Sequence, residues 1–235
     1  MEFVNLCRKS VYLGTESMIN SNSYLVEWQK ALDDRKSEGL YRSLKTTSNL
    51  VDFSSNDYLG LARNEELQGF VEKAYTEISY RNKLGSTGSR LISGNHPYFE
   101  ETEALLSKTH LAESTLLFNT GYMANLAVFS TLPRKGDTVL YDELCHACIK
   151  DGIRLSMAHR FPFWHNDLES LESKLKKANG QTYVAVESVY SMHGDFAPLA
   201  EMADLCARYH AVLVVDEAHT TGVYGQNGAG LVCAL

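Results

Sequence analysis

The 235-residue sequence has little positive charge: 22 Lys and Arg residues stand against 29 Asp and Glu residues, for a formal net charge of −7. Proteins that bind nucleic acids usually carry a basic excess, so this balance argues against that class. No apolar run approaches the ~20 residues of a membrane-spanning helix, and the N-terminus shows no signal-peptide pattern. We therefore expect a cytoplasmic protein that binds neither nucleic acid nor a membrane.

The sequence also lacks any Gly-Lys pair. This absence matters for the stretch VVDEAH at residues 214–219, which contains the letters of a helicase box. Such a box works together with an upstream phosphate loop, whose lysine and backbone amides hold the phosphates of ATP. The glycine clusters at residues 85–88 and 225–230 do not follow the order of a dinucleotide-binding loop either. Both nucleotide interpretations are therefore disfavoured.

The five cysteines do not form a disulfide framework, because their number is odd and their spacing irregular. Cys145-His146-Ala147-Cys148 is a single C-x-x-C, and no second pair follows it to complete a zinc site. We expect these two thiols to be ordinary buried residues. The sequence thus predicts no metal site.

Apolar residues indicate an α/β protein. Leu25, Trp28 and Leu32 fall at helical spacing within residues 24–42, a segment that we expect to form a helix ending near Gly39. Nearly continuous apolar runs at 183–186 and 212–215 are typical of parallel strands that are covered on both faces, and a helical pattern separates them. Further strands are predicted at residues 115–118 and 138–141, and a short one opens residues 50–62.

Several polar residues follow these predicted strands. Asp216 ends a buried strand, where a carboxylate is costly unless it meets a cation, and His219 comes three residues later. An alternative is that Asp216 merely caps the next turn. The segment 118–125 runs through Gly121 into a helix whose free amides could bind phosphate. His146 and Ser191 also follow strands. Because ligands of open α/β sheets bind at the carboxyl ends of the strands, the pattern suggests an aromatic ligand with one cationic point and a phosphate.

Taken together, these segments and others resemble the α-oxoamine synthase family of pyridoxal 5'-phosphate (PLP) enzymes, which has the aspartate-aminotransferase-like fold. The resemblance covers roughly residues 30–230, and the matching segments occur in the same order as in members of the family. They are ALDDRKSEGLYR, FSSNDYLGLA, GSTGSRLISGN, FNTGYMANLA, ESVYSMHGDFAPL and VVDEAHTTGVYGQNGAG.

The resemblance implies roles for individual residues. Asp216 would keep the pyridine nitrogen of PLP protonated, and His219 would hydrogen-bond the phenolic oxygen. His146 would stack on the ring and act as the catalytic residue that also contacts substrate. Ser89 and Arg90 would reach a dimer interface. The implied cofactor-binding set is Gly121, Tyr122, Met123, His146, Ser191, Asp216 and His219, and the implied substrate-binding set is Arg42, Asn56 and His146.

The resemblance also implies an organisation. Residues 1–60 would form a leader, a helix and a short strand, and residues 61–235 would form the mostly parallel sheet of the PLP-binding large domain. The family's Schiff-base lysine lies downstream of the aspartate, yet no lysine follows Lys177. We therefore expect an incomplete large domain without the C-terminal small domain, inactive as an isolated chain. An incomplete sheet would also leave apolar surface uncovered and invite aggregation.

The reaction implied is the condensation of an amino acid with an acyl-CoA and loss of carbon dioxide, in a homodimer. Within the family, the motifs are most similar to the members that join L-alanine to pimeloyl-CoA, or to pimeloyl on a carrier protein, in biotin biosynthesis. Members that use glycine or serine share most of these motifs and remain alternatives. A non-catalytic remnant or subunit without the lysine is an alternative of another class.

Overall fold

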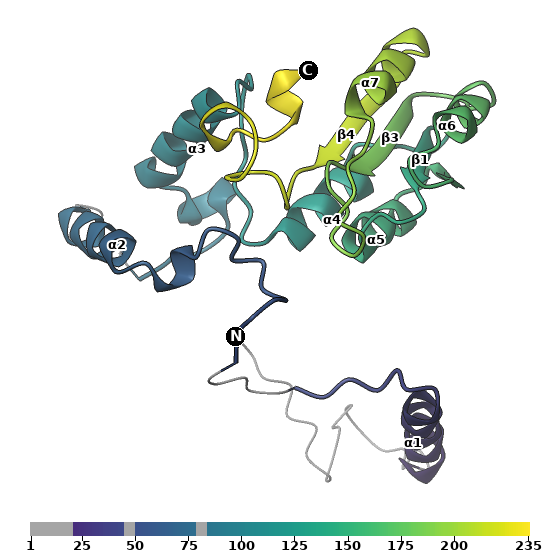
Figure 1. The fold of residues 1–235 in the computed structure, drawn as a ribbon, viewed down its shortest axis with the longest axis horizontal. Helices are drawn as coiled ribbons and strands as arrows, with labels where there is room; N and C mark the ends of the chain where they lie inside the picture. The colour runs from purple at the N-terminus through teal and green to yellow at the C-terminus, as the bar shows by residue number, and fades with distance from the viewer. Residues whose placement is uncertain (1–20, 45–49, 79–83) are drawn as a thin grey trace. The chain divides into compact units, whose positions relative to one another are not determined.

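The computed structural model describes residues 21–44, 50–78 and 84–235 (Figure 1). The chain divides into two compact units, Met1–Phe53 and Ser54–Leu235. Within the described residues, no helix is long and apolar enough to cross a membrane. The helical elements are α1 (Ser21–Ser37), α2 (Glu65–Glu77), α3 (Pro97–Thr109), α4 (Gly121–Thr131), α5 (Ala147–Leu155), α6 (Leu168–Leu175) and α7 (Leu199–Arg208), with short turns at η1 (Leu61–Arg63), η2 (Arg90–Gly94), η3 (Gln226–Gly228) and η4 (Val232–Ala234).

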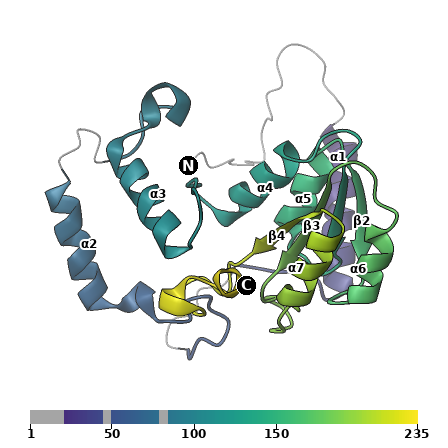
Figure 2. The ribbon, with the colours of Figure 1, turned by 90° about the horizontal axis from the view of Figure 1, so that it is seen from above.

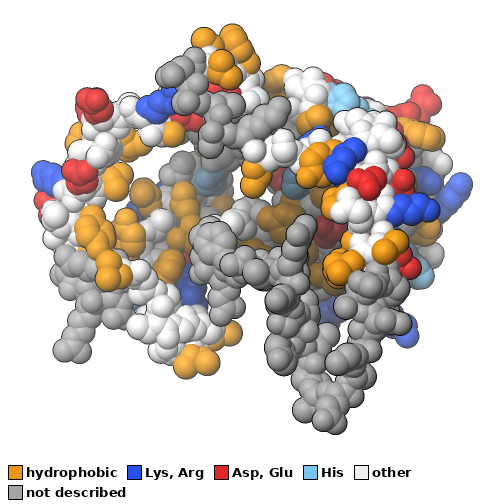
Figure 3. Space-filling model, turned by 90° about the horizontal axis from the view of Figure 1, so that it is seen from below, with side chains coloured by type: hydrophobic (Ala, Val, Ile, Leu, Met, Phe, Trp, Pro, Cys, Tyr) orange, Lys and Arg blue, Asp and Glu red, His pale blue; other side chains and the backbone are white. Residues whose placement is uncertain are grey.

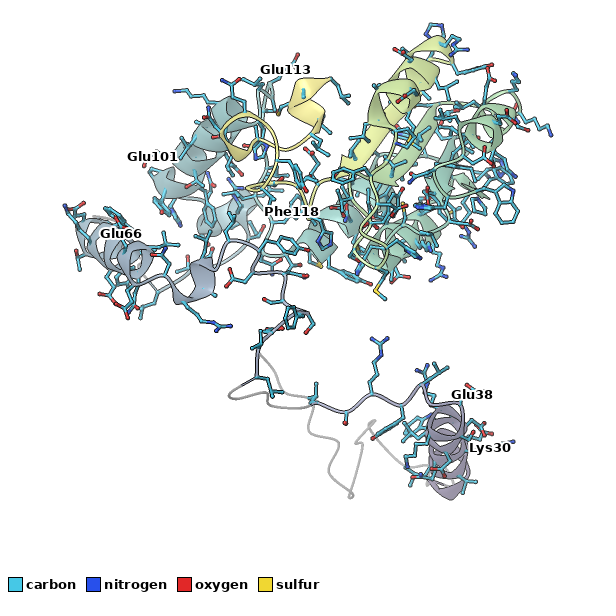
Figure 4. All side chains as sticks on the ribbon, viewed as in Figure 1. Lys30, Glu38, Glu66, Glu101, Glu113 and Phe118 are labelled. Atoms are coloured by element: carbon cyan, nitrogen blue, oxygen red, sulfur yellow. The ribbon has the colours of Figure 1, made fainter. Side chains whose placement is uncertain are left out.

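The first unit contains α1, whose prediction from the sequence is confirmed. The helix ends because Gly39 adopts a left-handed conformation with φ of 70°, and the Leu40 amide donates back to the Arg35 carbonyl. Lys30 and Glu38, labelled in Figure 4, are exposed side chains of this helical segment.

The second unit is built on four parallel strands, β1 (Thr138–Asp142), β2 (His159–Phe163), β3 (Thr182–Glu187) and β4 (Val212–Asp216). They pair in the order β2-β1-β3-β4. The chain moves outward from β1 to β2 and then returns past β1 to β3 and β4. The direction of travel therefore reverses between β1 and β3, and such a switch point opens a crevice at the carboxyl ends of the strands.

Helices cover both faces of this sheet. The crossovers place α5 on one face and α6 and α7 on the other, and α4 packs against α5 (Figure 2). The α4–α5 contact is close because Gly152 has no side chain: a Cβ there would lie 2.9 Å from the Cβ of Phe129. Val139, Leu140, Val184 and other fully buried side chains form the core between the layers.

Two of the predicted strands are absent. Residues 115–118 and 50–53 form no strand, although both are apolar. Leu116 and Phe118 remain partly exposed (Phe118 is labelled in Figure 4), and the Leu117 amide donates to the Glu103 carboxylate at 2.8 Å rather than to a neighbouring strand. The predictions at 138–141, 183–186 and 212–215 are confirmed as β1, β3 and β4.

The segment from α2 to α3 differs from the sheet region in its packing. Neither α2 nor α3 contains a buried residue, and hydrophobic side chains are visible on the exposed surface in Figure 3. Polar contacts hold its local structure. Arg90 forms a bidentate ion pair with Glu103, with Nη1–Oε1 and Nη2–Oε2 distances of 2.5 and 2.9 Å. The Arg90 guanidinium also lies over the ring of Phe99. The interface role predicted for Ser89 and Arg90 stays a prediction.

Candidate active site

A pocket of about 520 Å³ lies at the carboxyl edge of the sheet, a size that suits a small cofactor. It collects residues from several segments that are far apart in the sequence. Its lining includes six of the predicted site residues, Asn56, Gly121, Tyr122, His146, Asp216 and His219, together with Asn125, Cys148, Glu187 and Thr221. The sequence therefore indicated much of this pocket, and the structure adds further residues.

Asp216 ends β4 and presents its carboxylate to the pocket. One oxygen, Oδ2, accepts a hydrogen bond from Asn125 Nδ2 on α4 at 2.6 Å. The other, Oδ1, accepts from the backbone amide of Ala218 at 2.9 Å. No lysine or arginine among the described residues forms an ion pair with Asp216. A half-buried carboxylate held by neutral donors is well suited to bind a cationic group of a ligand.

The N-terminus of α4 faces the same pocket through Gly121 and Tyr122. Thr120 caps the helix, because its Oγ1 accepts from the Met123 amide at 3.1 Å. The amides of Gly121 and Tyr122 have no acceptor within the helix, as is general for a first turn. A Cβ added at Gly121 would meet no atom within 4 Å, so the approach to these amides is open. This arrangement suits an anionic group such as phosphate.

His146 immediately precedes α5 and caps it. Its Nδ1 accepts from the Cys148 amide at 3.2 Å, which leaves Nε2 as the nitrogen that carries the proton in the neutral ring. The His146 backbone amide donates to Glu187 Oε1 at 2.6 Å. The Nδ1 edge of the ring is thus held against Cys148, while His146 lines the pocket.

Glu187 is a site residue that the sequence reasoning missed. It ends β3, is paired in register with Asp216 on β4, and is only 5% exposed. Burial, together with the nearby charge of Asp216, raises the pKa of this carboxyl to about 7, against the hydrogen bond from the His146 amide. Asp216 was predicted because it follows a run of apolar residues. Glu187 also follows such a run, at residues 183–186.

His219 also lines the pocket. Its Nδ1 hydrogen-bonds the hydroxyl of Tyr58 at 2.6 Å. Tyr58 lies within the FSSNDYLGLA stretch, but no local pattern marks it as a partner of His219.

Three predicted site residues do not line this pocket. Met123 is in the first turn of α4, but its amide is bonded to Thr120. Ser191 is exposed in the turn after β3. Arg42 belongs to the first unit, so its role toward the site stays a prediction.

The C-x-x-C pair is buried, as expected from its spacing. Burial raises the pKa of both thiols, so neither is poised as a thiolate nucleophile. Within residues 21–44, 50–78 and 84–235, no cluster of His, Cys, Asp and Glu could hold a metal ion.

Comparison with known proteins identifies the family of this chain. Residues 48–234 match the family model "Aminotransferase class I and II". The 8-amino-7-oxononanoate synthase of Marinobacter nauticus is 39% identical over 218 residues, which cover 88% of this chain and 54% of that protein. The chain spans about half the length of such curated relatives.

Solved structures show the same fold. A serine palmitoyltransferase from S. paucimobilis, whose structure contains PLP and myriocin, matches with a TM-score of 0.74 and 28% identity, over 92% of this chain and 58% of that one. The 8-amino-7-oxononanoate synthase of Francisella tularensis matches with a TM-score of 0.64 and 29% identity, over 79% of this chain and 50% of that one. The chain belongs to the class I and II aminotransferase family, in its α-oxoamine synthase branch.

Proposed function

We propose that this chain carries the PLP-binding part of an α-oxoamine synthase, which condenses an amino acid with an acyl-CoA and releases carbon dioxide. The observation that supports this most directly is the Asp216 carboxylate at the end of β4, which shares a pocket with the open first turn of α4 and with two histidines. A ligand with a cationic ring nitrogen and a phosphate matches this pocket, because the nitrogen can meet Asp216 and the phosphate can meet the first turn of α4.

The donor set fits PLP. Asp216 would hold a proton on the ring nitrogen, because the carboxylate has only neutral hydrogen-bond donors among the described residues. The Gly121 and Tyr122 amides would bind the phosphate, and His219 would bind the phenolic oxygen. His146 would cover the ring and contact substrate. Met123 and Ser191 stay in the proposed cofactor set, although neither lines the pocket.

When bound, PLP withdraws electrons and stabilises negative charge next to the amino group of the substrate. The residues of this chain set the conditions for that chemistry. Asp216 keeps the ring nitrogen protonated, and Asn125 orients the Asp216 carboxylate. Arg42 would bind a substrate carboxylate with its planar guanidinium, and Asn56 would contact substrate from the pocket wall.

For the substrates, we favour L-alanine and a pimeloyl thioester, carried on CoA or a carrier protein, as in 8-amino-7-oxononanoate synthases of biotin biosynthesis. This choice is supported by relatives of that name at about 40% identity. Glycine C-acetyltransferase, 5-aminolevulinate synthase and serine palmitoyltransferase activities remain alternatives. A homodimer in the cytoplasm is part of the proposal.

The test of cofactor binding is equilibrium dialysis of the chain against PLP. We expect Asp216→Asn to weaken binding roughly 10- to 100-fold, because it removes a charge-assisted hydrogen bond that contributes about 1.5–3 kcal/mol. Asp204→Asn, at an exposed position on α7, is the matched control and should bind as the unchanged chain does. Equal binding by the Asp216 variant would contradict the proposal.

A non-catalytic role is the second candidate, and what bears on it is that residues 178–235 offer no lysine to PLP. The family uses a lysine downstream of the aspartate to bind PLP covalently as a Schiff base. We therefore expect the isolated chain to bind the cofactor without a Schiff base that borohydride could reduce to a stable bond. Mass spectrometry after reduction measures this. Co-purification with a complete homologue, without synthase activity of its own, would support a subunit role.

A further inference from the structure

The hydroxyl of Tyr58 and the Nδ1 atom of His219 are 2.6 Å apart, although 161 positions separate the two residues in the sequence. Their rings are inclined at 56° with centroids 6.0 Å apart, so the contact is made through the hydroxyl and not through ring stacking. No other described residue hydrogen-bonds the His219 ring, and Nε2 is therefore left for a ligand in the pocket that His219 lines.

The turn that carries Tyr58 is held by its own hydrogen bonds. The Gly60 amide donates to the Asp57 carbonyl at 3.1 Å and closes a turn over residues 57–60, and Gly60 leaves this turn in a left-handed conformation with φ of 68°. The Asp57 carboxylate accepts from the Ala62 amide at 3.3 Å. The backbone at Tyr58 is thus held by a turn whose hydrogen bonds do not involve the histidine.

The direction of this hydrogen bond decides which His219 nitrogen carries the proton. In a neutral imidazole one nitrogen is a donor and the other an acceptor. A phenol is a better donor than a neutral imidazole N–H, since phenols ionise with a pKa near 10. The 2.6 Å distance is also short for an N–H donor and ordinary for an O–H donor. Donation from Tyr58 to Nδ1 leaves the proton on Nε2.

We propose that Tyr58 is a positioning residue that fixes the tautomer of His219, so that Nε2–H points a hydrogen-bond donor into the pocket and selects a ligand with an acceptor oxygen there. This inference rests on the proposed function, in which that acceptor is the phenolic oxygen of PLP. A ligand that offers a donor at this place would instead meet an N–H and be rejected.

The direct test is NMR of the ¹⁵N-labelled chain at about pH 8, where ordinary histidines are neutral. Long-range proton–nitrogen spectra distinguish the two tautomers of each of the eight histidines, and a His219→Gln variant identifies the signals of His219. We expect the Nε2–H tautomer in the unchanged chain. In Tyr58→Phe, which keeps the ring but loses the hydroxyl, the signals should shift toward an average of both tautomers.

The matched control is Tyr183→Phe. This change also removes one hydroxyl and one hydrogen bond, from Tyr183 to the Leu132 carbonyl, but at the opposite end of the sheet, so the His219 signals should not move. The proposal is overturned if His219 carries its proton on Nδ1 in the unchanged chain, or if its signals are the same in Tyr58→Phe.

Dialysis against PLP separates this inference from the proposed function. We expect Tyr58→Phe to weaken PLP binding about tenfold and to have no further effect in a His219→Gln background, since Tyr58 acts through His219. If the unchanged chain does not bind PLP, the proposed function fails, while the tautomer is still read from the spectra. Equal losses from Tyr58→Phe in both backgrounds would contradict action through His219.

Discussion

The sheet region, residues 138–216, and the helical region, residues 65–78 and 84–109, both contain regularly spaced apolar residues but bury them to different extents. In β1 and β3 the aliphatic side chains are fully buried between helices, and only Tyr141 and Tyr183 are partly exposed. In α2, Leu67, Phe70 and Val71 form a stripe at helical spacing, yet all three are more than a third exposed. Periodicity therefore predicts which face of a helix is apolar, whereas only a second apolar surface buries it.

The difference predicts that similar substitutions have unequal effects in the two regions. Leu140→Ala, in the centre of β1, should lower the free energy of unfolding by about 2–5 kcal/mol, because the cavity cannot close within a packed core. Leu105→Ala, on the exposed side of α3, should change it by less than about 0.5 kcal/mol. Urea unfolding followed by circular dichroism measures both. Equal losses would show that α3 is packed in solution.

Stability should also depend on pH through Glu187. Its raised pKa means that the folded protein holds a proton between pH 4.5 and about 7 that the unfolded chain has released. Stability is therefore lost as the pH rises through this window, by roughly 3 kcal/mol at most. Glu187→Gln, which can still accept from the His146 amide, should remove this loss and be the more stable protein at pH 8. Exposed Glu201→Gln is the control, and a pH profile of Glu187→Gln like that of the unchanged chain would contradict the prediction.

Glycine substitutions should have opposite signs in the two regions. Gly152→Ala should destabilise by about 1–3 kcal/mol, since the new methyl group would overlap Phe129 and the Asn125 carbonyl. Gly69→Ala lies within α2 where a Cβ meets nothing within 4 Å, and it should stabilise by up to about 1 kcal/mol through helix propensity. Thermal unfolding of both variants checks the pair. A destabilising Gly69→Ala would reveal close packing on α2.

The smallest expected effect concerns Glu103, which holds the helical region locally. The hydrogen bonds from Arg90 and from the Leu117 amide lower the pKa of this carboxyl to about 2. Its contribution is therefore present above pH 4.5 and is lost as the pH falls toward about 2, the opposite sign to Glu187. Glu103→Gln should be slightly less stable than the unchanged chain at pH 7 and equal to it near pH 2. Urea titrations at the two pH values test this.

The parts of the fold that were predictable are those in which burial on both faces makes a strand continuously apolar, as in β3 and β4. The strand β2 was missed because His159, Arg160 and Pro162 interrupt its pattern at an edge of the sheet. The opposite error occurred at residues 115–118, where apolar residues without a neighbouring strand form none. An apolar run specifies that a segment can pair, but not that a partner strand lies beside it.

For the candidate site, the sequence alone predicted residues at strand ends and at a helix start, and Asp216 and Gly121 both line the pocket. Asn125 and Tyr58 could not, because their roles depend on which distant segments meet. Glu217 shows the same limit: it stands next to Asp216 in the sequence and lines the same pocket, but its carboxylate is bound by backbone amides of this chain. Its carboxylate accepts from the amides of Leu231 and Val232 and so anchors the following loop.

The hydrogen bond between Tyr58 and His219 also has a consequence for the timing of synthesis. At ~5–20 residues per second, a ribosome adds the 161 positions between the two residues in roughly 8 to 32 seconds. During that interval Tyr58 has already been synthesised, while its partner has not. A contact of such long sequence separation closes late, so the strands β1 to β3 can form before the pocket acquires its oriented histidine.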